Sequence, residues 1–119
     1  MPKQIRLSVD YQCWPLWWAG QSEVGEIDPG KLPLKPETAD RIEKWADWFD
    51  TWMDFEDAPH GKKPDDDEFE AFEQEGIEIW KELRKELAPD YEVAYNSKKL
   101  GRLVSHPDQL FDERQLEYA

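Results

Sequence analysis

The sequence has very little cysteine: Cys13 is the only one among 119 residues. A single thiol excludes an internal disulfide and a zinc framework built from cysteines, and it is typical of proteins from reducing compartments. No segment approaches the ~20 consecutive apolar residues that a membrane-spanning helix needs, and the N-terminus lacks the apolar run of a signal peptide. We therefore expect a cytoplasmic protein that does not enter a membrane.

Common catalytic motifs are also missing from the sequence. It contains no Gly-rich phosphate loop, no His-x-x-x-His pair and no Gly-x-Ser-x-Gly turn. A nucleophilic Cys13 would need a base, and only His60 and His106 are available, both in expected loops, so a buried structural cysteine is favoured. No pair among the many carboxylates is marked as buried or perturbed. We expect neither an enzyme nor a cofactor.

Positive charge is scarce: 15 Lys and Arg stand against 28 Asp and Glu, which gives a net charge of −13. Such a chain repels nucleic-acid backbones and anionic membranes, so neither is an expected partner, and basic proteins are favoured instead. Between Pro36 and Asp90 there are 19 acids and seven bases, so this segment carries 12 of the 13 net negative charges. The negative field is therefore expected on the segment that contains the predicted helices.

Aromatic residues, in contrast, are abundant, with seven Trp, five Phe and four Tyr. Each of these side chains can bury on the order of 150–250 Å². A chain of this length is expected to form one domain, spanning residues 1–119, that buries a core without metal or disulfide support.

The spacing of apolar residues predicts a helix from about Pro36 to about Phe55, the segment around which the chain is organised. One apolar stripe consists of Ile42, Ala46, Phe49 and Met53. A second stripe consists of Trp45, Trp48, Trp52 and Phe55. A row of carboxylates consists of Asp40, Glu43, Asp47, Asp50 and Asp54. We expect the first stripe to pack on a second helix, and the second stripe either to be covered by the segment 14–27 or to form part of a binding face.

A second helix is predicted from Asp65 to about Leu87, after an exposed loop at Ala58–Pro64. Its apolar stripe is Phe69, Phe72, Gly76, Ile79, Trp80, Leu83 and Leu87. Gly76 in the middle of this stripe costs roughly 1 kcal/mol of helix propensity relative to alanine. We expect that cost to be offset by a close approach between the two helices.

Alternating apolar residues predict strands on both sides of the helices. The first runs through Ile5, Leu7 and Val9; the segments 14–18 and 23–27 form a Trp-rich β-hairpin; a later strand begins at Tyr91, and a short one lies near 102–104. The predicted fold is α+β, with a small, mostly antiparallel sheet packed on an antiparallel two-helix hairpin. We expect the N-terminal strand to pair with the Tyr91 strand.

Two features could form a binding surface. Trp17 and Trp18 must point to opposite sides of a strand, so at least one is a candidate for exposure, and exposed tryptophans are frequent anchors of protein interfaces. The carboxylate row stacks like charges at three- and four-residue spacing, which costs a few tenths of a kcal/mol per pair. A solvated helix face explains such a row about as well as a docking site for a basic partner.

The run Asp65 to Glu68 is better explained by the positive end of a helix dipole than by cation binding, because it lacks a spaced calcium-loop pattern. It can still add to a negative docking surface. The predicted partner-binding residues are Trp17, Trp18, Trp48, Asp47, Asp50, Asp54, Asp65, Asp66, Asp67 and Glu68.

Several short motifs together resemble a group of small acidic bacterial proteins. These motifs are Trp-Pro-Leu-Trp-Trp at 14–18, Leu-Pro-Leu at 32–34, the Trp-rich helix, and Pro-Asp-Tyr-Glu-Val at 89–93. The resemblance covers nearly the whole chain and transfers no catalytic residue. In size, charge and aromatic content the chain also resembles immunity proteins, which neutralise basic nuclease toxins by occluding their active sites.

The leading hypothesis is therefore a protein that binds a basic partner, as an immunity protein or inhibitor of a nuclease toxin does. A small-ligand module would instead show a pocket lined by Trp14, Trp17 and Trp18. An acidic DNA mimic would arrange its carboxylates in rows at the spacing of phosphates. The sequence leaves the oligomeric state open.

Overall fold

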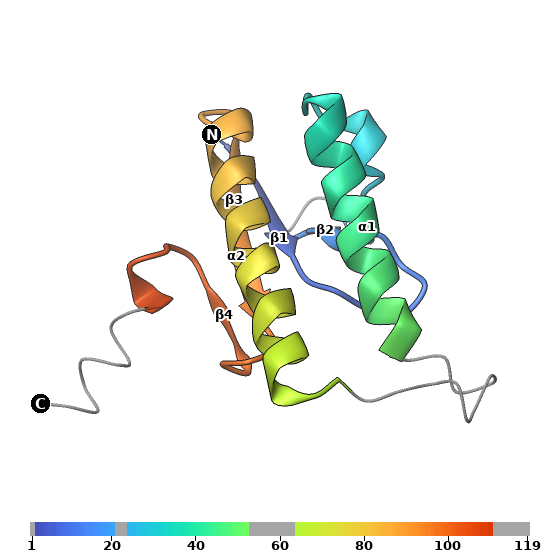
Figure 1. The fold of residues 1–119 in the computed structure, drawn as a ribbon. Coiled ribbons are helices and arrows are strands. Elements are labelled where there is room, and N and C mark those ends of the chain that lie inside the picture. Colours follow the sequence, from blue (N-terminus) through green and yellow to red (C-terminus); the bar gives the residue numbers. More distant parts are fainter. Residues whose placement is uncertain (1, 21–23, 53–63, 111–119) are drawn as a thin grey trace, which may run out of the picture.

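A computed structural model describes residues 2–20, 24–52 and 64–110. Within these ranges, the elements along the chain are β1 (Lys3–Leu7), β2 (Leu16–Trp18), the short 3-10 helix η1 (Pro29–Lys31), α1 (Pro36–Trp52), α2 (Asp66–Leu87), β3 (Tyr91–Ser97) and β4 (Arg102–Val104). The helices run antiparallel, side by side, on one face of the sheet (Figure 1). The α+β prediction is thus confirmed. In the described ranges, neither helix combines the length and apolar character that crossing a bilayer requires.

The sheet is mixed, which corrects part of the prediction. Its strand order is β2-β1-β3-β4; the two outer pairings are antiparallel, but β1 and β3 pair in parallel. The chain passes along the molecule three times between β1 and β3, in β2, α1 and α2, and so returns to the end where β1 started (Figure 1). β3 then has to run in the same direction as β1. The expected pairing of these two strands is correct.

The predicted return strand of the hairpin is shorter than expected. Within 24–27 it is reduced to a single bridge between Trp17 and Glu26, supported by a hydrogen bond from Ile27 N–H to the Leu16 carbonyl at 2.7 Å. Gly25 has a φ of 102°, which interrupts the extended conformation. β1, and not a long hairpin partner, supports β2.

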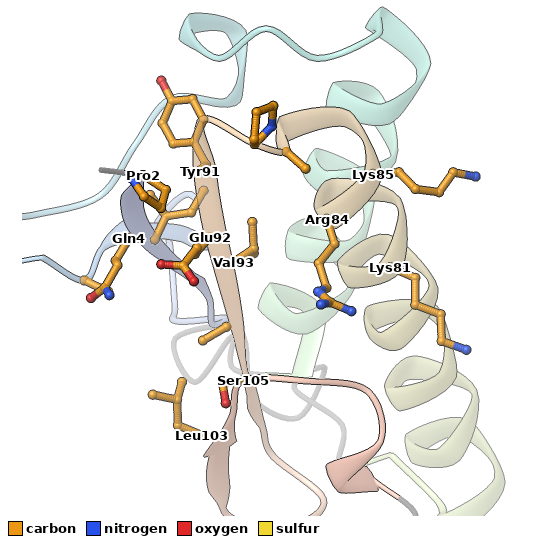
Figure 2. A pocket seen from close by; sticks show the side chains of 15 residues that line it. Pro2, Gln4, Lys81, Arg84, Lys85, Tyr91, Glu92, Val93, Leu103 and Ser105 are labelled. Carbon is orange, nitrogen blue, oxygen red and sulfur yellow. The ribbon is translucent and has the colours of Figure 1, made fainter.

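β4 is also short, as the sequence predicted. It pairs with Tyr95–Ser97 at the C-terminal end of β3. The first residues of β3 therefore lie beside α2 with no strand on that side within the described chain (Figure 2).

The buried face of α1 differs from the predicted division into two stripes. Ile42 and Trp45 are buried, whereas Ala46 and Phe49 are only partly buried. The Trp45 ring stacks on Phe72 of α2 with 4.7 Å between ring centroids, and its Nε1–H donates to the Phe72 carbonyl at 3.0 Å. Residues three apart share a helix face, so the face that meets α2 is centred between the two predicted stripes. The predicted stripe members Met53 and Phe55 and the loop at 58–63 lie outside the described residues.

Gly76 is the point of closest approach between the helices, as predicted. A Cβ atom at this position would lie 2.5 Å from Trp45 Cζ2 and 2.7 Å from the hydroxyl oxygen of Tyr95. The contact also includes β3, which the sequence did not predict. The absence of a side chain at this position lets α1, α2 and the sheet meet at one place.

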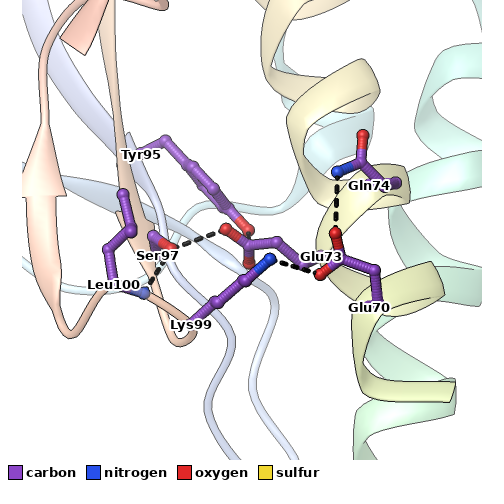
Figure 3. A network of polar contacts seen from close by, with 7 residues as sticks. All are labelled: Glu70, Glu73, Gln74, Tyr95, Ser97, Lys99 and Leu100. Atoms are coloured by element: carbon purple, nitrogen blue, oxygen red, sulfur yellow. Dashed lines mark hydrogen bonds and ion pairs between the residues drawn. The ribbon is translucent and has the colours of Figure 1, made fainter. Parts of the chain in front are cut away.

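A buried carboxylate joins α2 to β3 (Figure 3). Glu73 is only 2% exposed, and it accepts hydrogen bonds from the Tyr95 hydroxyl at 2.8 Å and from the Ser97 hydroxyl at 2.6 Å. Ser97 Oγ in turn accepts from Leu100 N–H at 3.0 Å. Burial, followed by the charge and hydrogen bond of Glu73, raises the pKa of Tyr95 far above its usual range, so the phenol stays a donor.

The two helices are also linked where α1 begins and α2 ends. Glu86 accepts hydrogen bonds from Lys35 N–H at 2.9 Å and from the Thr38 hydroxyl at 2.5 Å. Burial opposes ionisation of Glu86, but the hydrogen bonds from Thr38 and Lys35 outweigh it, and the pKa is lowered from its usual value. A side chain of α2 thus caps the N-terminus of α1.

We expect Glu86→Ala to lower the free energy of unfolding by about 1–2 kcal/mol at neutral pH, since it removes a cap and leaves donors of α1 without a partner. Because the folded pKa lies below the unfolded value of about 4.3, the contribution is complete above that value and disappears as the pH falls through the folded pKa. Urea unfolding at pH 7 and at acid pH measures the difference. Glu78→Ala, at an exposed position of α2, is the control. An effect of Glu86→Ala that is equally large in acid would contradict the assignment.

Candidate functional site

A concave surface lies between the loop after β1 and the outer face of α1. It has a volume of about 470 Å³ and is lined by Gln12, Cys13, Trp14, Glu26, Glu43, Ala46, Asp47 and Asp50. We call this surface the acidic cleft. Four of these eight residues carry carboxylates and none carries a positive charge. The arrangement is suited to receive a basic side chain.

Local hydrogen bonds determine the position of the loop that forms one wall. Asp10 accepts from Tyr11 N–H at 2.8 Å through its side chain and from Cys13 N–H at 3.3 Å through its carbonyl, which makes a tight turn. Gln12 has a φ of 58° in this turn. Its N–H donates to Asp50 of α1 at 3.0 Å, and this bond fixes the loop against the helix.

Trp14 is the exposed aromatic residue at this cleft. It is 39% exposed, while the next two residues, Pro15 and Leu16, are buried and anchor the segment. An amphipathic ring held beside several carboxylates presents both an apolar and a charged contact to a partner.

Cys13 contributes no nucleophile to the cleft. Burial, a hydrogen bond with Glu26 and the negative charges of Glu26, Asp10 and Asp50 all raise the pKa of its thiol. A thiol in such surroundings stays protonated at neutral pH and reacts slowly. The residue is partly buried, not fully buried as predicted.

The predicted tryptophans Trp17 and Trp18 lie elsewhere and are partly buried. Trp17 donates from Nε1 to the Ser8 carbonyl at 2.8 Å, and the Arg6 guanidinium lies 5.6 Å from its ring centroid. Trp18 packs against the core on the opposite sheet face, with the Lys3 ammonium 5.3 Å from its ring. Neither Trp17 nor Trp18 lines the acidic cleft. Of the three tryptophans in the segment 14–18, Trp14 alone does.

Two further residues that were predicted to bind a partner, Trp48 and Glu68, instead connect the two helices. Glu68 accepts from Nε1 of both Trp48 and Trp52, at 2.9 and 3.1 Å. This carboxylate therefore ties the C-terminal half of α1 to the first turn of α2. The two indoles are oriented by an acid that we expected to face a partner.

The remaining acids of the run 65–68 lie at the N-terminus of α2 and not at the acidic cleft. Asp65 caps α2 by accepting from Glu68 N–H at 2.7 Å, as expected of a helix N-terminus. Asp66 and Asp67 are exposed in the first turn and are not part of the cleft lining. Asp54 lies outside the described residues. In the described part of the chain, no group of three or more His, Cys, Asp or Glu is placed to hold a metal ion.

The structure thus brings Asp47 and Asp50 together with residues that were not on the predicted list. Glu43 belongs to the same carboxylate row, and its spacing to Asp47 and Asp50 is the signal that placed all three on one helix face. Glu26 and Gln12 come from distant loops, and no local pattern marks them.

Comparison with known protein families gave one informative match. The family described as Serratia CdiI immunity protein-like (CdiI_serr) matches residues 3–98. This range contains both helices, the strands β1 to β3 and the complete lining of the acidic cleft. A search of the curated proteins found no match.

Proposed function

Since the chain belongs to the Serratia CdiI immunity protein-like family, we propose that it neutralises a cognate toxin by binding the toxin through the acidic cleft. In this proposal the toxin is a basic protein, such as a nuclease, and the complex forms in the cytoplasm. The chain acts by occlusion and not by catalysis.

The observation that carries the proposal is the coincidence of four carboxylates and an exposed tryptophan in one concave surface. Nucleases bind phosphate backbones through lysine and arginine, so their active sites are positively charged. A negative cleft raises the association rate with such a surface by electrostatic steering. A large aromatic side chain at its edge supplies apolar area that slows dissociation.

The cleft is also held in place before a partner arrives. Asp50 is bonded to Gln12 N–H, so the loop and helix walls are joined in the free protein. Asp47 lies on the same helix, three residues before Asp50, and lines the same cleft. A surface that needs little reordering loses less conformational entropy on binding.

We expect the double substitution Asp47→Asn and Asp50→Asn to weaken toxin binding at least tenfold, since each charge in contact with a basic partner contributes about 1 kcal/mol or more. Asparagine at position 50 can still accept from Gln12 N–H, so the cleft keeps its shape. The candidate toxin is the product of the gene immediately upstream. Isothermal titration calorimetry at low and high salt measures the affinity, and the wild-type complex should weaken with salt.

The matched control is Asp66→Asn with Asp67→Asn, which removes the same net charge outside the cleft lining. We expect this pair to change the affinity less than threefold, a difference of about 0.6 kcal/mol. An equal loss for both pairs would mean that overall charge, and not the cleft, determines binding. Full affinity of the Asp47/Asp50 variant would remove the cleft from the interface.

A further inference from the structure

A second groove of about 820 Å³ lies between α2 and β3 (Figure 2). We call it the β3 groove. Its helix wall includes Lys81, Arg84 and Lys85, and its floor includes Tyr91 and Val93. Leu103 of β4, which is 54% exposed, also lines the groove. No residue of the acidic cleft lines this groove.

The floor of the groove is an open strand edge. β1 pairs with residues 91–95 on one side of β3, but β4 pairs only with residues 95–97 on the other side. On the β4 side, residues 91–94 therefore have no strand neighbour within the described chain. Backbone groups on such an edge are available to another extended segment.

The hydrogen-bond pattern identifies the groups at this edge. Lys3 N–H of β1 donates to the Asp90 carbonyl. In a parallel pair, alternate residues bond to the same neighbour, so residues 92 and 94 face β1 while Tyr91 and Val93 face the groove. In agreement, the Val93 carbonyl accepts from Trp80 Nε1 of α2 at 2.8 Å. This carbonyl has a second lone pair, and the N–H groups of Tyr91 and Val93 point to the same side.

The helix wall gives this edge a positive charge that is unusual for the chain. Three cations line the groove against a single acid, Glu92, on a protein whose net charge is −13. Lys81 and Lys85 are ion-paired with Glu78 and Glu82 of the same helix, at 3.6 and 3.7 Å, and pairs of this kind near the surface contribute little. The Arg84 guanidinium lies 6.0 Å from the Trp80 ring and points into the space between α2 and β3 (Figure 2).

We propose that the β3 groove binds an extended, acidic segment of a partner protein as an additional strand beside β3. Main-chain hydrogen bonds to Tyr91 and Val93 provide affinity, as in other cases of strand addition. Side chains alternate along a strand, so every second residue of the segment faces α2. Carboxylates at those positions meet Lys81, Arg84 and Lys85, and this charge complementarity selects an acidic sequence. The proposal goes beyond the toxin-binding function, because it concerns another surface with the opposite charge.

Synthetic hexapeptides test the proposal directly. The probe is acetylated and amidated Thr-Glu-Val-Glu-Val-Thr, and the comparison peptides carry Lys in place of Glu, or N-methyl groups on alternate backbone nitrogens. Titration of ¹⁵N-labelled protein should shift the Tyr91 and Val93 amides most. We expect the Lys peptide and the N-methylated peptide to bind at least tenfold more weakly, because the first is repelled by Lys81, Arg84 and Lys85 and the second loses strand hydrogen bonds.

A pair of substitutions assigns the charge effect to the groove wall. Lys81→Gln with Lys85→Gln should weaken the Glu peptide about threefold to tenfold, whereas Lys31→Gln with Lys44→Gln, at exposed positions outside the groove, should leave it unchanged. The amide spectrum itself confirms that each variant is folded.

Three results would overturn the proposal: no shift at millimolar Glu peptide, equal affinity for the Glu and Lys peptides, or shifts located away from β3. If the Glu peptide causes no shift, the role of Lys81, Arg84 and Lys85 is to prevent another strand from pairing with the edge of β3. The test is independent of the toxin-binding function, because Asp47→Asn with Asp50→Asn should leave peptide binding unchanged. Loss of toxin binding and loss of peptide binding can therefore be observed separately.

Discussion

Gly76→Leu is expected to remove most of the stability of this protein, and Gly76→Ala to lower the free energy of unfolding by about 1–3 kcal/mol. Alanine improves helix propensity by roughly 1 kcal/mol. That gain is outweighed because the new Cβ would lie 2.5 Å from a ring carbon of Trp45 and 2.7 Å from the Tyr95 hydroxyl oxygen. Neither group can move freely, since both are buried and hydrogen-bonded. Leucine adds three more carbons at the same place, at about 4 kcal/mol or more.

Urea unfolding followed by tryptophan fluorescence measures both variants. Gln74→Ala, at an exposed position of the same helix, is the control and should stay within about 0.5 kcal/mol of the wild type. A smaller ring at position 45 should relieve part of the clash, so Gly76→Ala combined with Trp45→Phe should show a favourable coupling of about 1 kcal/mol. A Gly76→Ala variant as stable as the wild type would mean that the helices separate at little cost.

The second large effect is expected at Glu73. Glu73→Ala should lower the free energy of unfolding by about 3 kcal/mol, because it leaves two buried hydroxyl donors, those of Tyr95 and Ser97, without their acceptor and opens a cavity. Thermal or urea unfolding measures the loss. Glu70→Ala, one turn earlier on α2 and partly exposed, is the matched control and should cost less than about 1 kcal/mol.

A triple variant tests whether the loss of stability in Glu73→Ala comes from the buried hydroxyl groups that it leaves unpaired. Glu73→Leu together with Tyr95→Phe and Ser97→Ala replaces the carboxylate and both hydroxyls by apolar groups, and of the network only Leu100 N–H loses its acceptor. Replacing both partners of a buried hydrogen bond by apolar groups is often close to neutral, so we expect the triple variant to recover most of the stability that Glu73→Ala loses. If the triple variant were the least stable of all, the carboxylate would contribute more than its two hydrogen bonds account for.

The local parts of the fold could be predicted because they depend on spacing along the chain. Apolar residues recur with a period of 3.6 in both helices and alternate in the first and third strands. The loss of helix propensity at Gly76 is likewise visible from the residues around it. Gly76 was informative because a glycine within an apolar stripe has a known cost, and only a close contact offsets it. The helix starts at Pro36 and Asp66 agree with the predicted ones within one residue.

The features of the fold and of the site that could not be predicted depend on contacts between residues far apart in the sequence. The bond from Gln12 N–H to Asp50 determines where Trp14 lies, and no pattern within either segment indicates it. Glu73 is one acid among many on its helix, and its burial becomes visible only when Tyr95 and Ser97 are placed opposite it. The parallel direction of β3 follows from the number of passes that the chain makes, which periodicity does not report.

The parallel pairing of β1 with β3 has a consequence for how the protein is made. β1 is a central strand, yet the strand that pairs with its second edge, beginning at Tyr91 opposite Lys3, follows both helices in the sequence. On the ribosome, the N-terminal strand has to wait until both helices have left the exit tunnel, because nonlocal strand pairs form only after the intervening chain has been ordered. A nascent chain that stops before β3 can therefore pair β1 only with β2, and the four-stranded sheet forms only after β3 and β4 have been synthesised.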